Sequence, residues 1–326
     1  MSEHIDKPEL NDSAQAAPSG KSGRKTLRRV LTRILVITAF ALIFLTGICV
    51  LLYPAMSNYI NEKNHSRVID SYEDNLKDLT PADYSACWAA ARAYNERLAS
   101  SGQEIRDAFS TQKKDTSGDH SGEYWNLLNV NGDGVMGFIT IDKVNIKLPV
   151  YHGTGEEVLA EGVGHIEGTS LPVGGETTHA VLSAHTGLPS AELFTNVDQL
   201  KEGDTFQLHI LDQVLTYQID QILTVLPDEV NSLELVSGKD YVTLVTCTPY
   251  GINDHRLLIR GTRVETPAAD AAEAAGAVQE TATVEMNWFQ RCIHQVFVAF
   301  ANIFEAVITF FVKASERVMD LFGVAY

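Results

Sequence analysis

The sequence predicts a mostly β protein, in which a β-barrel domain follows a membrane anchor and a helical segment. Short runs rich in β-branched residues, separated by Gly, Pro, Asn and Asp, recur between residues 137 and 264 and are typical of strands. An uncharged stretch from Ile34 to Leu52 is long enough to cross a bilayer. Between these parts, apolar residues recur at helical spacing. We expect the strands to close, or nearly close, into a barrel.

Residues 1–33 form a polar tail that becomes basic towards its end. The first 20 residues lack apolar periodicity, as disordered segments do, and six Lys or Arg stand between Lys21 and Arg33. All six precede the predicted transmembrane anchor at 34–53, so the positive-inside rule places the tail in the cytoplasm. A cleaved signal peptide is the alternative, but the apolar run is longer than usual for one and no clear cleavage site follows. The sequence therefore predicts a cell-membrane protein with a single N-terminal anchor, and the domain that follows the anchor is expected to be extracellular.

Residues 54–134 are expected to hold helices and one unusual connection. From Met56 to about Ser100 the apolar spacing is helical, and Thr80 followed by Pro81 is typical of a helix start. A polar segment between residues 101 and 122 is too long for an ordinary connection, so it is either functional or mobile.

The predicted barrel occupies residues 135–264. Its strand-like runs are FITI, IKLPVYHG, HAVLSAH, TFQLHI, LTYQIDQILTVL, YVTLVTC and RLLIRGTRV. A short helix is predicted at Ser190–Leu200, between the third and fourth of these runs.

Two segments follow the predicted barrel. Residues 265–287 are rich in Ala, Glu and Thr and are typical of a linker. Residues 288–326 are apolar, but polar side chains recur three or four residues apart and would form one stripe along a helix: Asn302, Glu305, Thr309, Lys313 and Glu316. This C-terminal hydrophobic helix is therefore an interfacial helix, a span whose polar stripe faces a partner, or part of a helical bundle.

Composition excludes several classes of function. The formal net charge is −17, and the first 33 residues carry seven Lys or Arg against four Asp or Glu, so the rest of the chain carries about −20. Nucleic acid is therefore not an expected partner. The four cysteines, Cys49, Cys87, Cys247 and Cys292, show no CxxC spacing and predict neither a zinc site nor a dithiol redox centre.

One segment resembles the start of a calcium-binding loop. Residues 129–134 read NVNGDG, but the twelfth position of such a loop is Thr140 rather than the Glu that would complete it. We interpret the segment as a Gly-rich turn, and no metal or cofactor is predicted.

Three side chains at strand ends could carry chemistry. His185 ends one apolar run, Cys247 ends another, and Arg256 begins the next. A thiolate is the nucleophilic form of cysteine and needs a neighbouring imidazole or guanidinium to form, and Arg can stabilise the oxyanion that acyl transfer creates. Each residue also has a plainer interpretation, since a lone Cys or His on an apolar strand is more often structural.

The segment around Cys247 resembles a known family. Residues 243–261, TLVTCTPYGINDHRLLIRG, are similar to the catalytic signature of sortases, in particular the pilin-polymerising class C sortases. The resemblance covers roughly residues 55–264 and includes four further segments: VMGFI at 135–139, LPVYHG at 148–153, GHIEGTSLP at 164–172 and LSAHTGLPS at 182–190.

This resemblance implies an eight-stranded barrel and a defined reaction. Cys247 would attack the Thr–Gly bond of an LPxTG-like sorting signal carried by a pilin subunit, giving a thioacyl enzyme. A pilin lysine amine would then resolve that intermediate. His185 would act as acid and base, and Arg256 would stabilise the oxyanion.

The resemblance also implies a lid over the site. Class C enzymes use an Asp-Pro-aromatic motif, and the matching residues here are Asp107, Ala108 and Phe109. Asp107 would pair with Arg256, and Phe109 would cover Cys247. Alanine in place of proline predicts a more mobile lid, and the alternative is that the segment is a disordered linker.

Several alternatives remain open at the level of sequence. His165 and His255 are interpreted as structural, and Thr246 is expected to hydrogen-bond near the substrate. The protein could instead be a housekeeping sortase that attaches proteins to peptidoglycan, or a hydrolytic cysteine peptidase. A hypothesis from a different functional class is a non-catalytic surface-binding module, in which Cys247 is merely buried.

Overall fold

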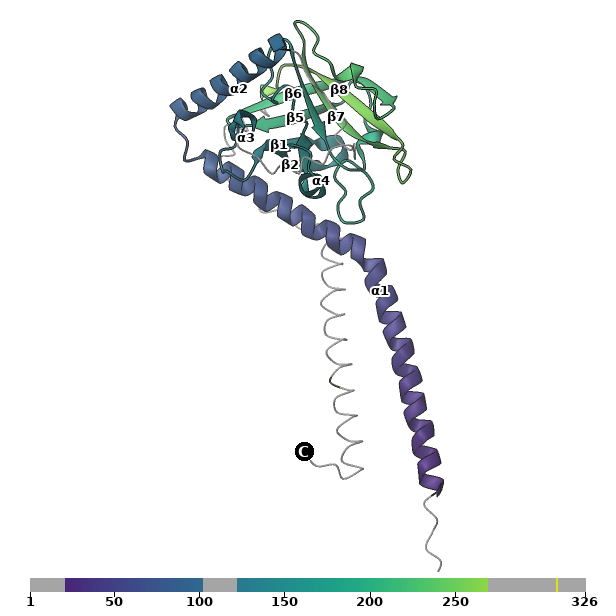
Figure 1. The fold of residues 1–326 in the computed structure, drawn as a ribbon. Coiled ribbons are helices and arrows are strands. Elements are labelled where there is room, and N and C mark those ends of the chain that lie inside the picture. Colours follow the sequence, from purple (N-terminus) through teal and green to yellow (C-terminus); the bar gives the residue numbers. More distant parts are fainter. Residues whose placement is uncertain (1–20, 102–121, 269–308, 310–326) are drawn as a thin grey trace, which may run out of the picture. The chain divides into compact units, whose positions relative to one another are not determined.

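The strands form a closed eight-stranded barrel, as the sequence predicts (Figure 1). The computed structural model describes residues 21–101, 122–268 and 309. The strands are β1 (Val135–Ile141), β2 (Ile146–His152), β3 (Val163–His165), β4 (Thr178–Ser183), β5 (Thr205–Ile210), β6 (Gln213–Val225), β7 (Asp240–Thr248) and β8 (His255–Arg263). Their order around the barrel is β1-β2-β3-β4-β7-β8-β6-β5, and β5 pairs with β1 to close it.

Two of the pairings are parallel, and they bring distant parts of the chain together. β2 pairs with β3, and β4 pairs with β7, in parallel; the other neighbours are antiparallel. The β4–β7 pair joins segments separated by about 60 residues. β7 and β8 are antiparallel neighbours joined by a short loop. The ends of β4 and β7 and the start of β8 therefore meet at one place on the barrel.

Side-chain alternation divides the buried residues of these strands between two faces. Leu182 and Leu244 belong to the large core inside the barrel, whereas Val181 and Val245 pack into a small second cluster on the outer face. Successive residues of a strand point to opposite faces, so the strand runs are apolar on both sides here. The loop after β6 covers the outer cluster with Val230 and Leu233.

The helices are α1 (Lys21–Leu76), α2 (Pro81–Ser101), α3 (Glu123–Asn126) and α4 (Glu156–Glu161), with 3-10 turns η1 (Asp142–Val144), η2 (Val197–Gln199) and η3 (Asn231–Leu233). α2 begins as the sequence predicts. The Asp83 amide donates to Thr80 Oγ1 at 3.3 Å, and Asp83 Oδ2 accepts from the Thr80 amide at 2.8 Å, a reciprocal cap.

The chain divides into two compact units, residues 1–54 and 55–326. In the first, α1 contains an 18-residue window with a mean hydropathy of 2.9, none of it buried. Within the described residues it is the one helix long and apolar enough to cross a membrane, by length and composition.

In the second unit, residues 55–76 of α1 pack on the barrel. Tyr72 Oη donates to the Met136 carbonyl at 3.1 Å and accepts from the Leu211 amide at 2.9 Å. α2 is also tied to the domain, since Trp88 Nε1 donates to Asp212 Oδ1 at 2.8 Å. Residues 55–76 of α1 and the whole of α2 therefore belong to the folded unit that carries the strands.

The helix predicted at Ser190–Leu200 is wrong. The segment holds only a bridge between Leu188 and Ala191 and the three-residue turn η2. Its apolar residues at helical spacing, Leu193, Phe194 and Val197, are all buried against the barrel. The apolar side chains of this segment are therefore buried by tertiary packing without a helix being formed.

β3 is not among the strand-like runs that were predicted from the sequence. It has three residues, one of them Gly164, and so lacks the β-branched run that identifies the others. A side chain at Gly164 would place its Cβ 2.4 Å from the Gly153 carbonyl oxygen, so the close approach of β2 requires glycine there.

Apart from residue 309, the C-terminal helix predicted at 288–326 lies outside the described residues, as does most of the linker at 265–287.

Candidate active site

Two of the three candidate catalytic residues lie on neighbouring strands, and the third follows the end of the next strand. Cys247 near the end of β7 is the register partner of Arg256 at the start of β8. On the other side of β7, Ser183 of β4 pairs with Val245 in parallel. The Ala184 amide donates to the Val245 carbonyl at 3.2 Å, so the pairing continues one residue beyond β4. His185 follows directly and is thus placed beside the end of β7.

All three residues share the outer face of the barrel. Strand alternation puts Val181 and His185 on one side of β4, Val245 and Cys247 on one side of β7, and Arg256 with Leu258 on β8. Val181, Val245 and Leu258 form the small outer core. The candidate site therefore begins where this outer core ends.

Cys247 is held by its neighbour in the strand. Cys247 itself is partly exposed, whereas Thr246 is 2% exposed and donates from Oγ1 to the Ala184 carbonyl at 2.8 Å. Thr246 thus fixes β7 to the residue before His185. Its hydroxyl hydrogen is used in this bond, and the expected hydrogen bond near the substrate stays a prediction.

His185 is half-buried at the start of the loop between β4 and β5. Burial lowers the pKa of its imidazole, and the negative charge of Glu156 at the start of α4 raises it in part. Burial disfavours the charged imidazolium, whereas a nearby carboxylate favours it. His185 can therefore exchange a proton, and Glu156 supports its protonated form.

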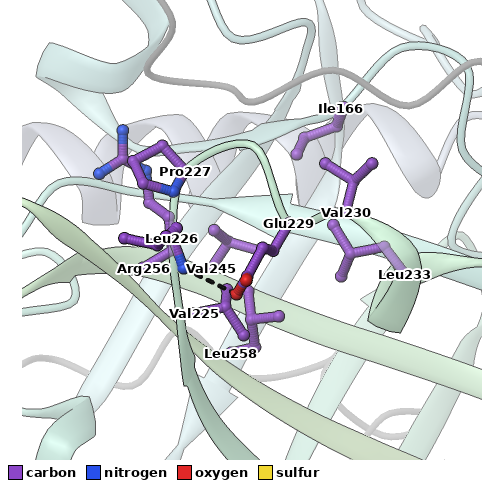
Figure 2. Close-up of a pocket in the computed structure, with 10 residues that line it drawn as sticks. All are labelled: Ile166, Val225, Leu226, Pro227, Glu229, Val230, Leu233, Val245, Arg256 and Leu258. Carbon is purple, nitrogen blue, oxygen red and sulfur yellow. Dashed lines mark hydrogen bonds between the residues drawn. The ribbon is translucent and has the colours of Figure 1, made fainter.

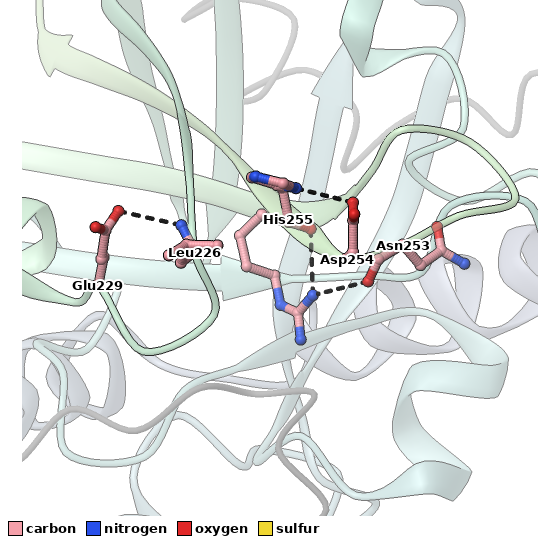
Figure 3. Close-up of polar contacts among 6 residues, drawn as sticks. Leu226, Glu229, Asn253, Asp254 and His255 are labelled. Atoms are coloured by element: carbon pink, nitrogen blue, oxygen red, sulfur yellow. Dashed lines mark hydrogen bonds and ion pairs between the residues drawn. The ribbon is translucent and has the colours of Figure 1, made fainter.

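Arg256 is 7% exposed, and its guanidinium lies against backbone oxygens. Nη1 donates to the carbonyl of Asn253 at 3.4 Å and to that of His255 at 3.2 Å. Figure 3 shows the side chains of Asn253, Asp254 and His255 around this turn. A guanidinium remains charged at every physiological pH, so the site holds a fixed cation beside Cys247.

An apolar pocket adjoins this cation (Figure 2). The loop after β6 forms one wall and strands β7 and β8 form the floor. The lining residues are Ile166, Val225, Leu226, Pro227, Glu229, Val230, Leu233, Val245, Arg256 and Leu258. Its empty volume is about 270 Å³, part of which is open to solvent.

The turn that closes this wall is held by a backbone bond and by a side chain. The Glu229 amide donates to the Leu226 carbonyl at 3.0 Å. Glu229 Oε2 accepts from the Leu226 amide at 3.1 Å, a contact drawn in Figures 2 and 3. The pocket is thus a small, mainly apolar hollow, with the charged side chains of Glu229 and Arg256 in its lining.

The other two histidines considered in the sequence are placed differently. His165 is fully buried, with Nε2 facing the Ser170 carbonyl at 2.8 Å and Nδ1 facing Tyr124 Oη at 2.9 Å. Burial lowers its pKa to about 4. His255 is partly exposed and contacts Asp254 at 2.8 Å. These contacts give His165 a structural role that joins α3 to β3.

Asn129 and Asp133, in the calcium-loop-like segment, accept backbone hydrogen bonds from Gly134 and Val135 at 2.9 and 3.1 Å. Over the ranges that the structure describes, no group of three potential metal ligands is present.

The predicted lid residues Asp107 and Phe109 lie outside the described residues. Sequence reasoning missed Glu156 and the pocket residues of the β6–β7 loop. Val230 and Leu233 are apolar residues in a loop, which is a signal, but the chain alone does not say which strands they cover. Glu156 precedes His185 by 29 residues, and only the parallel β2–β3 connection brings α4 close.

Comparison with known proteins shows which family this chain resembles. Residues 139–264 match the family model described as a sortase domain. A sortase C1 structure from Streptococcus agalactiae is 46% identical, with a TM-score of 0.56 over 62% of this chain and 100% of that chain. A sortase C from Streptococcus pneumoniae, whose structure was described in connection with pilin substrate specificity, is 44% identical, with a TM-score of 0.57 over 62% of this chain and 98% of that chain.

Among curated proteins, sortase A of Streptococcus agalactiae serotype III (strain NEM316) is 35% identical over 117 residues. That alignment covers 35% of this chain and 47% of the relative, so the chain spans about half the length of this curated relative.

Proposed function

Because this chain belongs to the sortase family, we propose that it is a cysteine transpeptidase that cleaves an LPxTG-like sorting signal between Thr and Gly. The observation that carries this proposal is the register of the strands. Cys247 is paired with Arg256, and His185 follows the β4 residues paired with β7, all on one face. A nucleophile, a proton carrier and a fixed cation are the three groups that acyl transfer through a thioester needs.

In the first half-reaction, the Cys247 thiolate attacks the carbonyl carbon of the Thr residue. A C–S bond forms, and the carbonyl oxygen becomes an oxyanion that the Arg256 guanidinium stabilises. The oxyanion then collapses, the Thr–Gly C–N bond breaks, and His185 donates a proton to the departing Gly amine. The product is a thioacyl enzyme.

In the second half-reaction, an amine attacks the thioester carbon. His185 accepts the proton that the amine loses, the new C–N bond forms, and the C–S bond breaks to return the Cys247 thiolate. If water attacked instead, the same steps would release a free carboxylate, which is the reaction of a peptidase. The choice of nucleophile therefore decides the biological outcome.

The pocket beside Arg256 is the part of the site that would recognise the sorting signal. Its walls are apolar, with Val230 and Leu233 on one side and Val245 on the floor. The Leu and Pro of an LPxTG sequence are apolar and precede the scissile bond. We assign the pocket to these residues because it lies next to the cation beside Cys247.

A pilin lysine is the proposed acceptor, on a pilin subunit presented outside the membrane. The likeness to sortase C structures, at 44–46% identity, supports this choice. The basic residues before the apolar window of α1 support an N-terminus in the cytoplasm and a catalytic domain outside the cell. A housekeeping role, with a peptidoglycan amine as acceptor, is the second candidate and is supported by the 35% identity to a sortase A.

The predicted lid is part of this proposal. Asp107 would pair with Arg256 and Phe109 would cover Cys247, which would slow the entry of substrate. We expect Asp107→Ala and Phe109→Ala to raise the initial rate of peptide cleavage; an unchanged rate in both variants would contradict a lid.

The acceptor can be tested on the full chain in detergent micelles. The protein is incubated with an LPxTG peptide and equal amounts of a lysine-containing pilin-type peptide and an oligoglycine amine, and products are identified by mass spectrometry. We expect an isopeptide-linked product with the lysine peptide, and none from Cys247→Ala. Ligation to oligoglycine alone would favour the housekeeping role, and hydrolysis alone would favour a peptidase.

A further inference from the structure

We propose that Asn58 and Asn61, on α1, are positioning residues for His185. This inference rests on the proposed role of His185 as acid and base. It concerns the part of α1 that lies in the same compact unit as the barrel, residues 55–76.

Both asparagines are hydrogen-bonded to the loop that follows His185. Asn61 Nδ2 donates to the Ser190 carbonyl at 2.6 Å, and Asn58 Oδ1 accepts from the Glu192 amide at 3.0 Å. The two asparagines are three residues apart, so they lie on one face of the helix. Their partners are two residues apart on the loop. These two hydrogen bonds, Asn61 to Ser190 and Glu192 to Asn58, form two adjacent clamps. They join segments about 130 residues apart in the sequence.

The clamped loop returns to His185 within a few residues. The Phe194 amide donates to the His185 carbonyl at 3.1 Å, and the Gly187 amide donates to Thr195 Oγ1 at 3.0 Å. Ala191 and Phe194, on either side of Glu192, are buried. A displacement of the clamped residues is therefore passed to the backbone of His185 through Phe194.

The loop needs this support because strand pairing ends just before His185. The Ala184 amide donates to the Val245 carbonyl at 3.2 Å, one residue before His185. Leu193 has φ of 40°, a conformation that a bulky side chain adopts only when its surroundings impose it. The backbone after His185 is thus held by hydrogen bonds within the loop and by the two hydrogen bonds from α1.

The position of an acid and base group affects turnover more than substrate binding. A shift of about 1 Å in a catalytic group can cost on the order of 100-fold in rate, because proton transfer requires a short and aligned contact. Asn58 and Asn61 are assigned no contact with substrate. Their loss should therefore lower kcat and leave KM nearly unchanged.

Replacing Asn by Asp is expected to have opposite effects at the two positions, because Asn61 donates its hydrogen bond to the loop and Asn58 accepts its own. Asn61→Asp removes the donor and places a carboxylate against the Ser190 carbonyl, so this clamp is lost. Asn58→Asp keeps an oxygen to accept from the Glu192 amide, and Asn58→Ala removes it. Asn58→Asp also loses the contact of Asn58 Nδ2 with Glu62 Oε1 at 3.3 Å, so Glu62 is changed to Gln in the parent and in every variant. Asn75→Asp is the matched control: Asn75 lies on the same helix and donates to the Ser71 carbonyl of α1 itself at 2.8 Å.

We would measure two properties of each variant, using the full chain in detergent micelles. One is kcat and KM for cleavage of an LPxTG peptide. The other is the pH dependence of Cys247 alkylation by iodoacetamide, followed on the Cys247 peptide by mass spectrometry, which requires neither a sorting signal nor an acceptor. Thermal melting shows that each variant is folded at the assay temperature, and His185→Ala gives the profile without the imidazole.

We expect Asn61→Asp and Asn58→Ala to lower kcat about five- to tenfold, the size expected when one hydrogen bond of about 1 kcal/mol is lost. KM should change by less than twofold, and the alkylation profile should move towards that of His185→Ala. Asn58→Asp and Asn75→Asp should behave as the parent. Clamp variants with the parent's kcat and alkylation profile would overturn the inference. If His185→Ala itself left alkylation and cleavage unchanged, the role of His185 would fail first, and the inference with it.

Discussion

Arg256 combines burial with a fixed set of partners. Its side chain is 7% exposed, and two backbone carbonyls accept from one of its terminal nitrogens. These contacts leave the planar guanidinium oriented as well as charged. A lysine would keep the charge, but its single ammonium cannot reproduce the planar set of donors.

We expect Arg256→Lys to lower kcat for peptide cleavage by about 100-fold or more, the usual size for loss of an oxyanion-stabilising donor. Arg260→Lys is the matched control, because Arg260 lies on the same strand and face but pairs with Asp220 at 2.9 Å. Equal activity of Arg256→Lys and Arg260→Lys would contradict the proposed role. Steady-state cleavage of a fluorogenic LPxTG peptide provides the measurement.

Glu156 sets the protonation of His185 in part. Its negative charge raises the pKa of the imidazole against the larger lowering by burial. Removing the charge in Glu156→Gln should therefore lower the pKa of His185, so its proton is lost at a lower pH. A titration of the imidazole by NMR with labelled histidine would show this shift.

Glu157→Gln, a change in the same helical turn, is the control for Glu156→Gln, and we expect it to have little effect. The shift from Glu156→Gln should shrink as salt is added, because Glu156 is exposed. A His185 pKa that rises in Glu156→Gln would contradict the electrostatic explanation.

At the scale of elements, the loop between β6 and β7 connects the fold with substrate recognition. It covers the outer core and supplies one wall of the pocket through Val230 and Leu233. Because Val230 lines the pocket but is only half-buried, it can be changed without opening the barrel core.

We expect Val230→Asp to raise KM for the LPxTG peptide several-fold, since a carboxylate in the pocket would oppose an apolar side chain there. Alkylation of Cys247 should remain as in the parent. Val236→Asp provides the control, because Val236 is on the same loop, 43% exposed and outside the pocket lining. A lower kcat at unchanged KM in Val230→Asp would assign the loop a different role.

The strands were predictable where the chain supplies a β-branched run between turn residues, as in β5 and β7. β3 was not, because three residues with a glycine carry no such pattern. The segment at 190–200 was predicted as a helix from its apolar spacing. Its partners are the barrel core and the asparagines of α1, and neither can be read from a local pattern.

The candidate site was predictable for a related reason. His185, Cys247 and Arg256 stand at the ends of recognisable strands, and strand ends that pair must meet. Glu156 and the pocket wall were not predictable, because their place depends on how loops fold back over the barrel. The lid residues, Asp107 and Phe109, remain a prediction.

At the scale of the whole molecule, buried histidines make the free energy of unfolding depend on pH. His165 has its pKa lowered to about 4 from an ordinary value near 6.5, because burial disfavours its charged form. The folded state therefore favours the neutral imidazole. This contribution to the free energy of unfolding is fully present above about pH 6.5, and it is lost as the pH falls towards 4.

We expect the free energy of unfolding to fall as the pH decreases from about 6.5 to about 4, by up to roughly 3 kcal/mol from His165 alone. Burial also lowers the pKa values of His65 and His179, which adds to the fall. His165→Gln should be less stable than the parent at neutral pH but should lose less on acidification. Denaturant titrations across this range test the prediction, and equal pH slopes for both proteins would contradict it.

The central claim, that Cys247 carries the acyl group, is tested most directly by trapping the intermediate. The full chain in detergent is mixed briefly with an LPxTG peptide, quenched in acid and digested, and the Cys247 peptide is examined by mass spectrometry. The account predicts an added mass equal to the peptide that ends at Thr less one water, attached at Cys247 as a thioester and removed by hydroxylamine. Cleavage that continues in Cys247→Ala, or an adduct on another residue, would contradict it.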